Sequence, residues 1–296
     1  MILDVLQQNL AFFVTAIFVL GLLVGSFLNV VIYRLPIIFK REWRIDCCNY
    51  LEENYSAKIQ LDSSKEPSKP FNLVKPDSTC PGCGHQIRAW ENIPVISYIF
   101  LKARCSECGI PISVRYPFVE LLSAILAATC AWHFGFSLAG FSAIFLTWAL
   151  ITLALIDFDT QYLPDQITLP FLWLGLLLNL NQTFTDIESA IIGTVAGYLT
   201  LWSVHHGFKL ITKKDGMGYG DFKLLALLGA WMGWQLLPAI IIISSLVGSF
   251  IGISLIIFKQ HQREIPIPFG PYLAIAGWIV LLWGPQINQI YLNWIS

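Results

Sequence analysis

Long apolar runs alternate with short polar connections along most of the chain. The first run covers about residues 10–33, a polar stretch follows over 34–115, and apolar runs resume after Tyr116. The later runs are separated by glycine, proline or a few polar residues and lie at about 117–136, 138–156, 167–180, 187–208, 222–234, 236–258 and 270–292. Because about 18 apolar residues suffice to cross a bilayer as a helix, the pattern predicts an all-α polytopic membrane protein with about eight transmembrane helices.

Two of these runs are short for a membrane span. The runs at 167–180 and 222–234 have only 13 or 14 residues. At ~1.5 Å per residue each covers roughly 20 Å, less than the ~30 Å hydrocarbon core. We therefore expect both helices to be tilted, extended at their ends or partly re-entrant.

The pattern divides the chain into three parts. A first transmembrane helix falls within residues 1–33, a polar insert covers 34–115, and a seven-helix membrane domain covers 116–296. Residues 40–77 of the insert show scattered charges and weak periodicity. They predict an irregular segment without chemistry of its own.

Composition and charge agree with a membrane protein. The chain is 56% hydrophobic and 12% charged, against roughly 25% charged in an average soluble domain. With a net charge of −1, binding of nucleic acid through basic charge is excluded, and we expect the lipid bilayer but no nucleic acid as a partner. Twelve of the 18 Lys and Arg lie in 34–115, four in 209–223, and the last two are Lys259 and Arg263. With eight spans these segments share one side of the membrane, which the positive-inside rule identifies as cytoplasmic, with both termini outside.

Four cysteines form two Cys-x-x-Cys pairs, Cys80 with Cys83 and Cys105 with Cys108, separated by 21 residues. Two such turns can place four thiolates around one tetrahedral Zn²⁺, although the usual gap is about 15–20 residues. The alternative is a pair of disulfides, which the reducing cytosol disfavours. A closed four-Cys site leaves no open position for water, so the predicted zinc is structural.

Two carboxylates stand at the ends of apolar runs, where burying a charge is costly and suggests function. Asp157 ends the third run, and Asp221 begins the sixth, after the glycine-rich segment GMGYGD. Both ends are cytoplasmic on the expected topology, so the two carboxylates can meet at one depth. A carboxylate pair that shares one proton is the arrangement of aspartic proteases. The alternative makes Asp221 a first-turn or capping acid and Asp157 an interfacial loop acid.

Other ionisable residues near the spans leave alternatives open. Asp159 and Asp165 are either loop acids or alternative members of the dyad. Lys223 either stabilises an aspartate or anchors its helix at the interface. Glu120 either pairs with Arg115 or faces a cofactor cavity.

Six segments, in order, resemble the bacterial type IV prepilin peptidase/N-methyltransferase family. The GMGYGD segment resembles the Gly-x-Gly-Asp protease motif of that family. The six segments are GSFLNVVIYRLP at 25–36, the two Cys pairs, RYPFVELL at 115–122, LIDFDTQYLPD at 155–165, GMGYGD at 216–221 and PIPFGPYLAIAGW at 266–278. The resemblance covers nearly the whole chain apart from about 40–75.

The resemblance implies an aspartic endopeptidase of the bacterial inner membrane whose active site faces the cytoplasm. Its substrates would be type IV prepilins and type II secretion pseudopilins, cut after a Gly. The new N-terminal residue would then be methylated with S-adenosylmethionine as the methyl donor, to which no residues are assigned. The family pattern implies that Asp157 and Asp221 are catalytic and that the zinc ligands are Cys80, Cys83, Cys105 and Cys108. One departure is Ala103, where the family often has a Gly linked to methylation.

Two other functions agree less well with the sequence. A Gly-x-Gly-Asp intramembrane protease without methylation would not need the zinc insert or the segment at 25–36. A transporter or channel could use intramembrane carboxylates as proton relays, but the sequence has no evident inverted repeat to support it.

Overall fold

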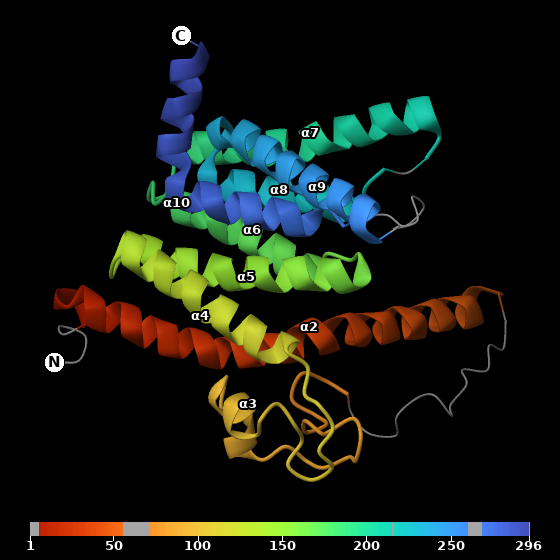
Figure 1. Cartoon of the computed structure of the whole chain (residues 1–296). Helices are drawn as coiled ribbons and strands as arrows, with labels where there is room; N and C mark the ends of the chain where they lie inside the picture. The colour runs from red at the N-terminus through yellow and green to blue at the C-terminus, as the bar shows by residue number, and fades with distance from the viewer. Residues whose placement is uncertain (1–5, 56–70, 215, 260–267, 296) are drawn as a thin grey trace. The chain divides into compact units, whose positions relative to one another are not determined.

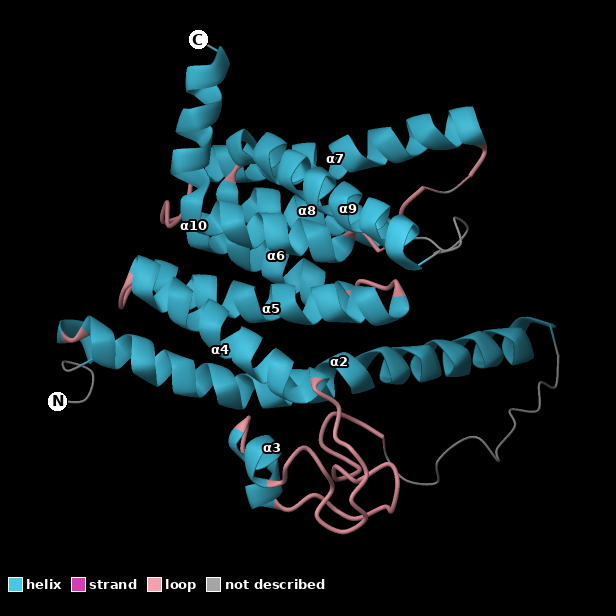
Figure 2. Cartoon of the chain, in the orientation of Figure 1, coloured by secondary structure: helices cyan, strands magenta, loops and turns pink. Residues whose placement is uncertain are grey.

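The computed structural model describes residues 6–55, 71–214, 216–259 and 268–295. Arg263, which entered the charge pattern, and residues 56–70 of the expected irregular segment lie outside the described residues. Figure 2 shows helices and loops, without a strand in the described part of the chain. The all-helical class predicted from the sequence is confirmed.

Eight long helices account for the eight apolar runs. Among the described residues they are α2 (Leu10–Tyr55), α4 (Arg115–Phe134), α5 (Leu138–Thr160), α6 (Asp165–Asn179), α7 (Ile187–Thr212), α8 (Tyr219–Met232), α9 (Leu237–Lys259) and α10 (Gly270–Ile295) (Figure 1). Shorter elements are the helix α3 (Ile96–Phe100) and the 3₁₀ turns Ala89–Asn92 and Trp234–Leu236.

Six of these helices are long and apolar enough to cross a membrane, so the chain is a multi-pass membrane protein. The two exceptions are α6 and α8, with 15 and 14 residues. They correspond to the two short runs, and their length does not support counting them as full spans.

The chain divides into two compact units. The C-terminal unit comprises residues 1–15 and 126–296, and the N-terminal unit comprises residues 16–125. Both α2 and α4 pass from one unit into the other.

The helix α2 does not end where its apolar run ends. It continues past residue 33 to Tyr55, with Pro36 inside it, so the expectation of irregular structure is wrong for residues 40–55. An existing helix is extended at little cost, and Lys, Arg, Glu and Leu favour that extension without an amphipathic face. Residues 71–77 have no regular structure, as expected.

The core of the C-terminal unit is α8, which packs against α6, α7 and α10. Its side chains are buried from Asp221 to Met232, with Lys223 as the exception. The Asn179 side chain at the end of α6 donates to the carbonyls of Ala230 and Trp231, at 2.9 and 3.0 Å. A helix that is apolar on all sides is a core helix. Protein rather than lipid surrounds α8, so 14 residues suffice.

Candidate functional site

The first candidate catalytic residue, Asp157, lies in the last turn of α5. The helix closes at Gln161, whose φ is 54° and whose N–H donates to the Asp157 carbonyl at 2.8 Å. The Asp157 side chain is buried, and its Oδ2 accepts a 3.0 Å hydrogen bond from the N–H of Gly270. Gly270 is the first residue of α10. A helix N-terminus therefore faces one oxygen of this carboxylate and stabilises negative charge there.

The second candidate, Asp221, lies in the first turn of α8, three residues after the N-cap Gly218. Its side chain is also buried. Within the described part of the chain, its Oδ1 has no hydrogen-bond partner. A buried polar oxygen without a partner destabilises the fold, so this one requires an explanation.

The two carboxylates lie close enough together for their charges to repel. Leu163 packs between the segments that carry them. A Cβ placed on Gly220 would lie 2.8 Å from Leu163 Cβ, and one placed on Gly270 would lie 2.6 Å from Asp157 Oδ2. The end of α5 and the starts of α8 and α10 thus converge so closely that a side chain at either glycine position would force its neighbour to move.

The other acids near this site occupy different places. Asp165 begins α6, and both of its oxygens contact Nζ of Lys223, at 2.8 and 2.7 Å. Lys223 therefore forms an ion pair with Asp165, and this pair joins the start of α6 to the first turn of α8. Asp159 is exposed. Burial and proximity to Asp221 therefore single out Asp157 from these three acids.

A cavity of about 290 Å³ opens between α9 and the start of α10. Its aromatic wall consists of Phe269 and Tyr272, which flank Gly270 in the sequence. Ser245, Gly248 and Ser249 of α9 form the opposite side. Phe269 directly precedes Gly270, whose N–H donates to Oδ2 of Asp157.

In the N-terminal unit, the four paired cysteines converge. Their Sγ atoms all lie within 4.8 Å of one another, and Cys80 Sγ is 3.7 Å from Cys108 Sγ. In a tetrahedral site with Zn–S bonds of ~2.3 Å, sulfurs are about 3.8 Å apart. The donor set and its spacing fit one Zn²⁺ held by Cys80, Cys83, Cys105 and Cys108.

The two Cys turns have the same backbone geometry. In each turn the first cysteine donates its N–H to the carbonyl five residues further on, at 2.8 and 2.9 Å. The glycine after the second cysteine, Gly84 or Gly109, has a φ of 74° or 71°. This left-handed conformation favours glycine and lets each turn aim both sulfurs at one point.

A buried carboxylate that the sequence analysis missed joins the two turns. Glu91 accepts hydrogen bonds from Ser106 Oγ and the Arg88 N–H, at 2.5 and 2.8 Å, and lies 3.0 Å from His85 Nε2. The hydrogen bonds from Ser106 and Arg88, with a contribution from His85, lower the pKa of Glu91 from 4.5 to about 2. No motif marked this residue, because its partners lie on both turns and meet only in the fold.

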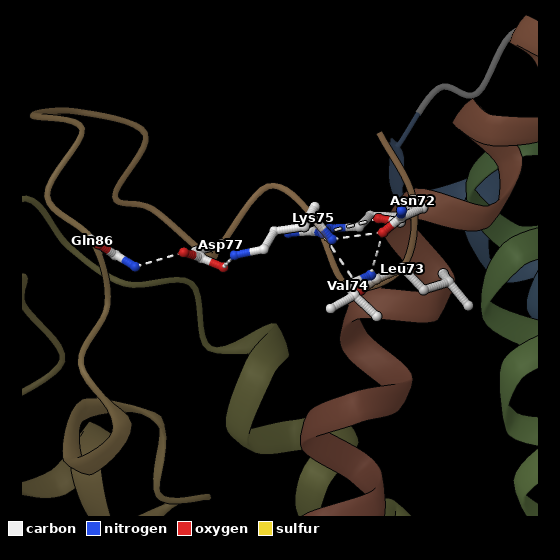
Figure 3. A network of polar contacts seen from close by, with 7 residues as sticks. Asn72, Leu73, Val74, Lys75, Asp77 and Gln86 are labelled. Atoms are coloured by element: carbon white, nitrogen blue, oxygen red, sulfur yellow. Dashed lines mark hydrogen bonds and ion pairs between the residues drawn. The ribbon is translucent and has the colours of Figure 1, made fainter. Parts of the chain in front are cut away.

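Polar contacts also connect α2 to the first Cys turn. Arg34 of α2 donates to the Asn72 carbonyl at 3.1 Å, and Asn72 Oδ1 accepts the N–H of Lys75 at 2.7 Å. Lys75 Nζ contacts Asp77, which in turn accepts from Gln86 at 2.7 Å (Figure 3). This network fixes residues 72–86 against the helix.

The departure at Ala103 has a structural consequence. Ala103 has a φ of 58°, and the preceding Lys102 has a φ of 51°. The Ala103 N–H and carbonyl are both engaged, with Tyr98 at 2.9 Å and Ile112 at 2.8 Å. A left-handed conformation suits Gly better than Ala, which gives a physical reason for the Gly often found here in the resembled family.

Comparison with known proteins covers both units. The model of the bacterial Peptidase A24 N-terminal domain matches residues 19–134, and that of the type IV leader peptidase family matches residues 144–253. The prepilin leader peptidase/N-methyltransferase of Pseudomonas aeruginosa is 51% identical over 293 residues, which cover 99% of this chain and 98% of the relative. Those of Aeromonas hydrophila and Neisseria gonorrhoeae are 52% and 47% identical, over 94% of this chain and 93% of each relative. No solved structure matches. The chain therefore belongs to the type IV leader peptidase family.

Proposed function

We propose that this protein is a membrane aspartic endopeptidase and N-methyltransferase that processes type IV prepilins and type II secretion pseudopilins. The observation that carries the proposal is the pair Asp157 and Asp221, both buried and within range of each other's charge in a multi-pass membrane protein. The names of the similar proteins, prepilin leader peptidase/N-methyltransferase, supply the substrate class and both reactions.

The geometry supports water-mediated peptide hydrolysis. Two adjacent carboxylates hold one proton between them, because both cannot easily be ionised. The ionised carboxylate takes a proton from water as the water oxygen attacks the carbonyl carbon, and the other carboxyl protonates the carbonyl oxygen. The tetrahedral intermediate then collapses, the C–N bond breaks and the leaving amine takes up a proton. The unpartnered Oδ1 of Asp221 is available to hold the water, whereas Oδ2 of Asp157 is held by Gly270.

The cavity beside Gly270 is assigned to the substrate. A prepilin has an apolar segment directly after its cleavage site, usually beginning with Phe. The aromatic rings of Phe269 and Tyr272 suit an apolar or aromatic side chain. We assign the cavity to the residue that follows the scissile bond.

The charge pattern supports a dyad at the cytoplasmic face of the inner membrane. Lys209, Lys213 and Lys214 lie at the end of α7 and at the start of the loop that leads to Asp221, and basic connections lie on the cytoplasmic side. We propose that the chain comprises a first membrane-crossing segment within 1–33, formed by the start of α2, a cytoplasmic insert over 34–115 and a peptidase domain over 116–296.

The zinc site and the methyl transfer are assigned to the insert. Four thiolates at Cys80, Cys83, Cys105 and Cys108 would hold a Zn²⁺ that crosslinks the two turns, and such a closed site has a structural role. S-adenosylmethionine would supply the methyl group, which the new N-terminal amine would accept on its nitrogen while losing a proton. Positioning alone can supply roughly 7–11 kcal/mol in such reactions, so the aspartates are not required.

The test uses the purified full-length protein in detergent with a prepilin substrate. Asp157→Asn and Asp221→Asn should each lower the cleavage rate by orders of magnitude, because the shared proton is lost. Both variants should still methylate a pre-cleaved pilin with labelled S-adenosylmethionine. Asp159→Asn, on the same helix but exposed, is the matched control and should cleave normally. Normal cleavage by Asp157→Asn, or parallel loss of both reactions in folded variants, would contradict the proposal.

A further inference from the structure

An exposed apolar surface lies in the middle of the polar insert. Residues 92–101 contain no charged residue, and they include α3 and its N-terminal flank. We call residues 93–100 the α3 segment. Four of its large side chains are exposed, with exposed fractions of 43% for Ile93, 50% for Ile96, 68% for Ile99 and 80% for Phe100. A contiguous apolar patch of this kind marks an interaction surface.

A hydrogen bond to α4 fixes the depth of this segment. Glu120 Oε2 accepts the N–H of Val95, the N-cap of α3, at 2.8 Å. Glu120 is the sixth residue of α4, a membrane-crossing helix that begins at Arg115. At ~1.5 Å per residue, Glu120 lies about 7.5 Å further into the span than Arg115. The start of α3 therefore lies beside the membrane-embedded part of α4.

The packing of α4 on α2 gives a second, independent measure of the depth of Glu120. A Cβ on Gly25 of α2 would lie 2.7 Å from Glu120 Cα, so these residues are at the same level. The first charged residue of α2 is Arg34, nine positions further on. This spacing corresponds to about 13 Å along the helix. The contact between Glu120 and Val95 therefore lies deeper in the apolar part of the span than Arg115 on α4 and than Arg34 on α2.

The backbone of the segment suits a medium without water. The N–H groups of Ser97, Ile99, Leu101 and Ala103 donate to carbonyls between Ile93 and Ser97 or, for Ala103, to Tyr98. Backbone polar groups at membrane depth must be hydrogen-bonded within the protein, and these N–H groups of α3 and its C-terminal flank are. Val95 has a φ of 60°, which is strained for a β-branched residue. Such strain persists where surrounding contacts impose it, so the Glu120 contact marks a fixed position rather than a loose loop.

We propose that the α3 segment is embedded in the lipid of the membrane beside α2 and α4, with Ile96, Ile99 and Phe100 in contact with acyl chains. The occupant of this surface is lipid because the segment lies at the depth of two membrane-crossing helices. The insert is thus anchored in the membrane at three places, at its two ends and at the α3 segment. On the proposed function, this anchor holds the Cys turns at the membrane surface, where the N-terminus of a cleaved substrate emerges.

The test is photo-crosslinking of the full-length protein in nanodiscs of phosphatidylethanolamine and phosphatidylglycerol. p-Benzoylphenylalanine replaces Phe100 in one variant and Ile99 in a second. The matched control places it at Val74, which is 75% exposed in the same unit. Val74 follows Leu73, whose carbonyl lies 3.5 Å from Nη1 of Arg34, so it lies at the level of the first charge of α2.

The expected result is a phospholipid adduct, identified by mass spectrometry, as the main product at positions 99 and 100 and little adduct at position 74. Equal lipid adduct at positions 74 and 100 would overturn the proposal. So would adducts to another copy of this chain or, with substrate added, to the prepilin. Because crosslinking needs no catalysis, failure here is distinguishable from failure of the proposed enzymatic function. Monodisperse elution of each variant establishes that it is folded.

Discussion

The contact between Gly270 and Asp157 allows a catalytic group to be displaced without removing it. In Gly270→Ala, the new Cβ would lie 2.6 Å from Asp157 Oδ2, 3.1 Å from its Cγ and 3.3 Å from Leu163 Cδ1. Ordinary van der Waals contact begins near 3.4 Å, so the carboxylate must retreat by about 0.8 Å. The atom that has to move is the end of a side chain, so the carboxylate shifts while the helices stay in place.

The size of the effect follows from the hydrogen bond that is lost. A retreat of about 0.8 Å stretches the 3.0 Å bond from the Gly270 N–H beyond hydrogen-bonding range. Hydrogen bonds to charged groups contribute about 1.5–3 kcal/mol, which corresponds to roughly 10- to 100-fold in rate. Misplacing a reacting group by about 1 Å can cost a similar factor. We expect kcat for prepilin cleavage to fall about 10- to 100-fold with little change in KM.

The assay is cleavage of a purified prepilin by the full-length variant in detergent, with methylation of pre-cleaved pilin measured in parallel. Gly207→Ala is the matched control, because a Cβ at Gly207 of α7 meets nothing within 4 Å. That variant should cleave normally. The reasoning is refuted if Gly270→Ala cleaves at the normal rate. It is also refuted if Gly270→Ala loses cleavage and methylation in parallel, which would indicate a folding defect.

Three further predictions concern the N-terminal unit. Elemental analysis should find about one Zn²⁺ per chain, and Cys108→Ser should lower this content, whereas full zinc in Cys108→Ser would exclude that residue as a ligand. Ala103→Gly should raise the free energy of unfolding of the unit by up to about 1 kcal/mol, because glycine adopts φ near 58° without a steric penalty; thermal unfolding at matched zinc content measures this, and a fall would contradict it. Glu91→Gln should release zinc to a chelator faster than the parent chain, since it weakens charge-assisted hydrogen bonds worth about 1.5–3 kcal/mol, and an unchanged release rate would show that this carboxylate does not hold the turns together.

The apolar runs were sufficient to predict the helices but not what surrounds each helix. All eight apolar runs are helical in the described residues, because a long apolar run has few alternatives in a membrane. The sequence could not show that α8 is surrounded by protein, since burial depends on which helices pack around it. Nor could it show that α2 extends to Tyr55, because the end of an apolar run marks the end of the apolar environment and not the end of the helix.

The candidate metal site and the candidate catalytic site also contain residues whose partners the sequence could not reveal. The four cysteines were found because their spacing repeats along the chain, whereas Glu91 depends on partners that only the folded turns bring together. Lys223 lies two residues from Asp221, and the sequence left open whether it stabilises an aspartate or anchors its helix at the interface. In the fold it binds Asp165, 58 residues away. On a helix, side chains two positions apart do not face each other, so the position of Lys223 next to Asp221 in the sequence did not indicate this partner.

The arrangement of helix ends explains why the candidate dyad needs residues from three distant segments. Asp157 lies at the C-terminal end of α5, where the partial negative charge of the helix disfavours a second negative charge. Asp221 and Gly270 lie in the first turns of α8 and α10, whose free N–H groups carry partial positive charge. The N–H of Gly270, 113 residues from Asp157, offsets the unfavourable helix end and holds one oxygen in place. A sequence motif around either aspartate alone lacks this contribution. The segment at 268–278 therefore belongs to the candidate active site as much as the two segments that carry the carboxylates.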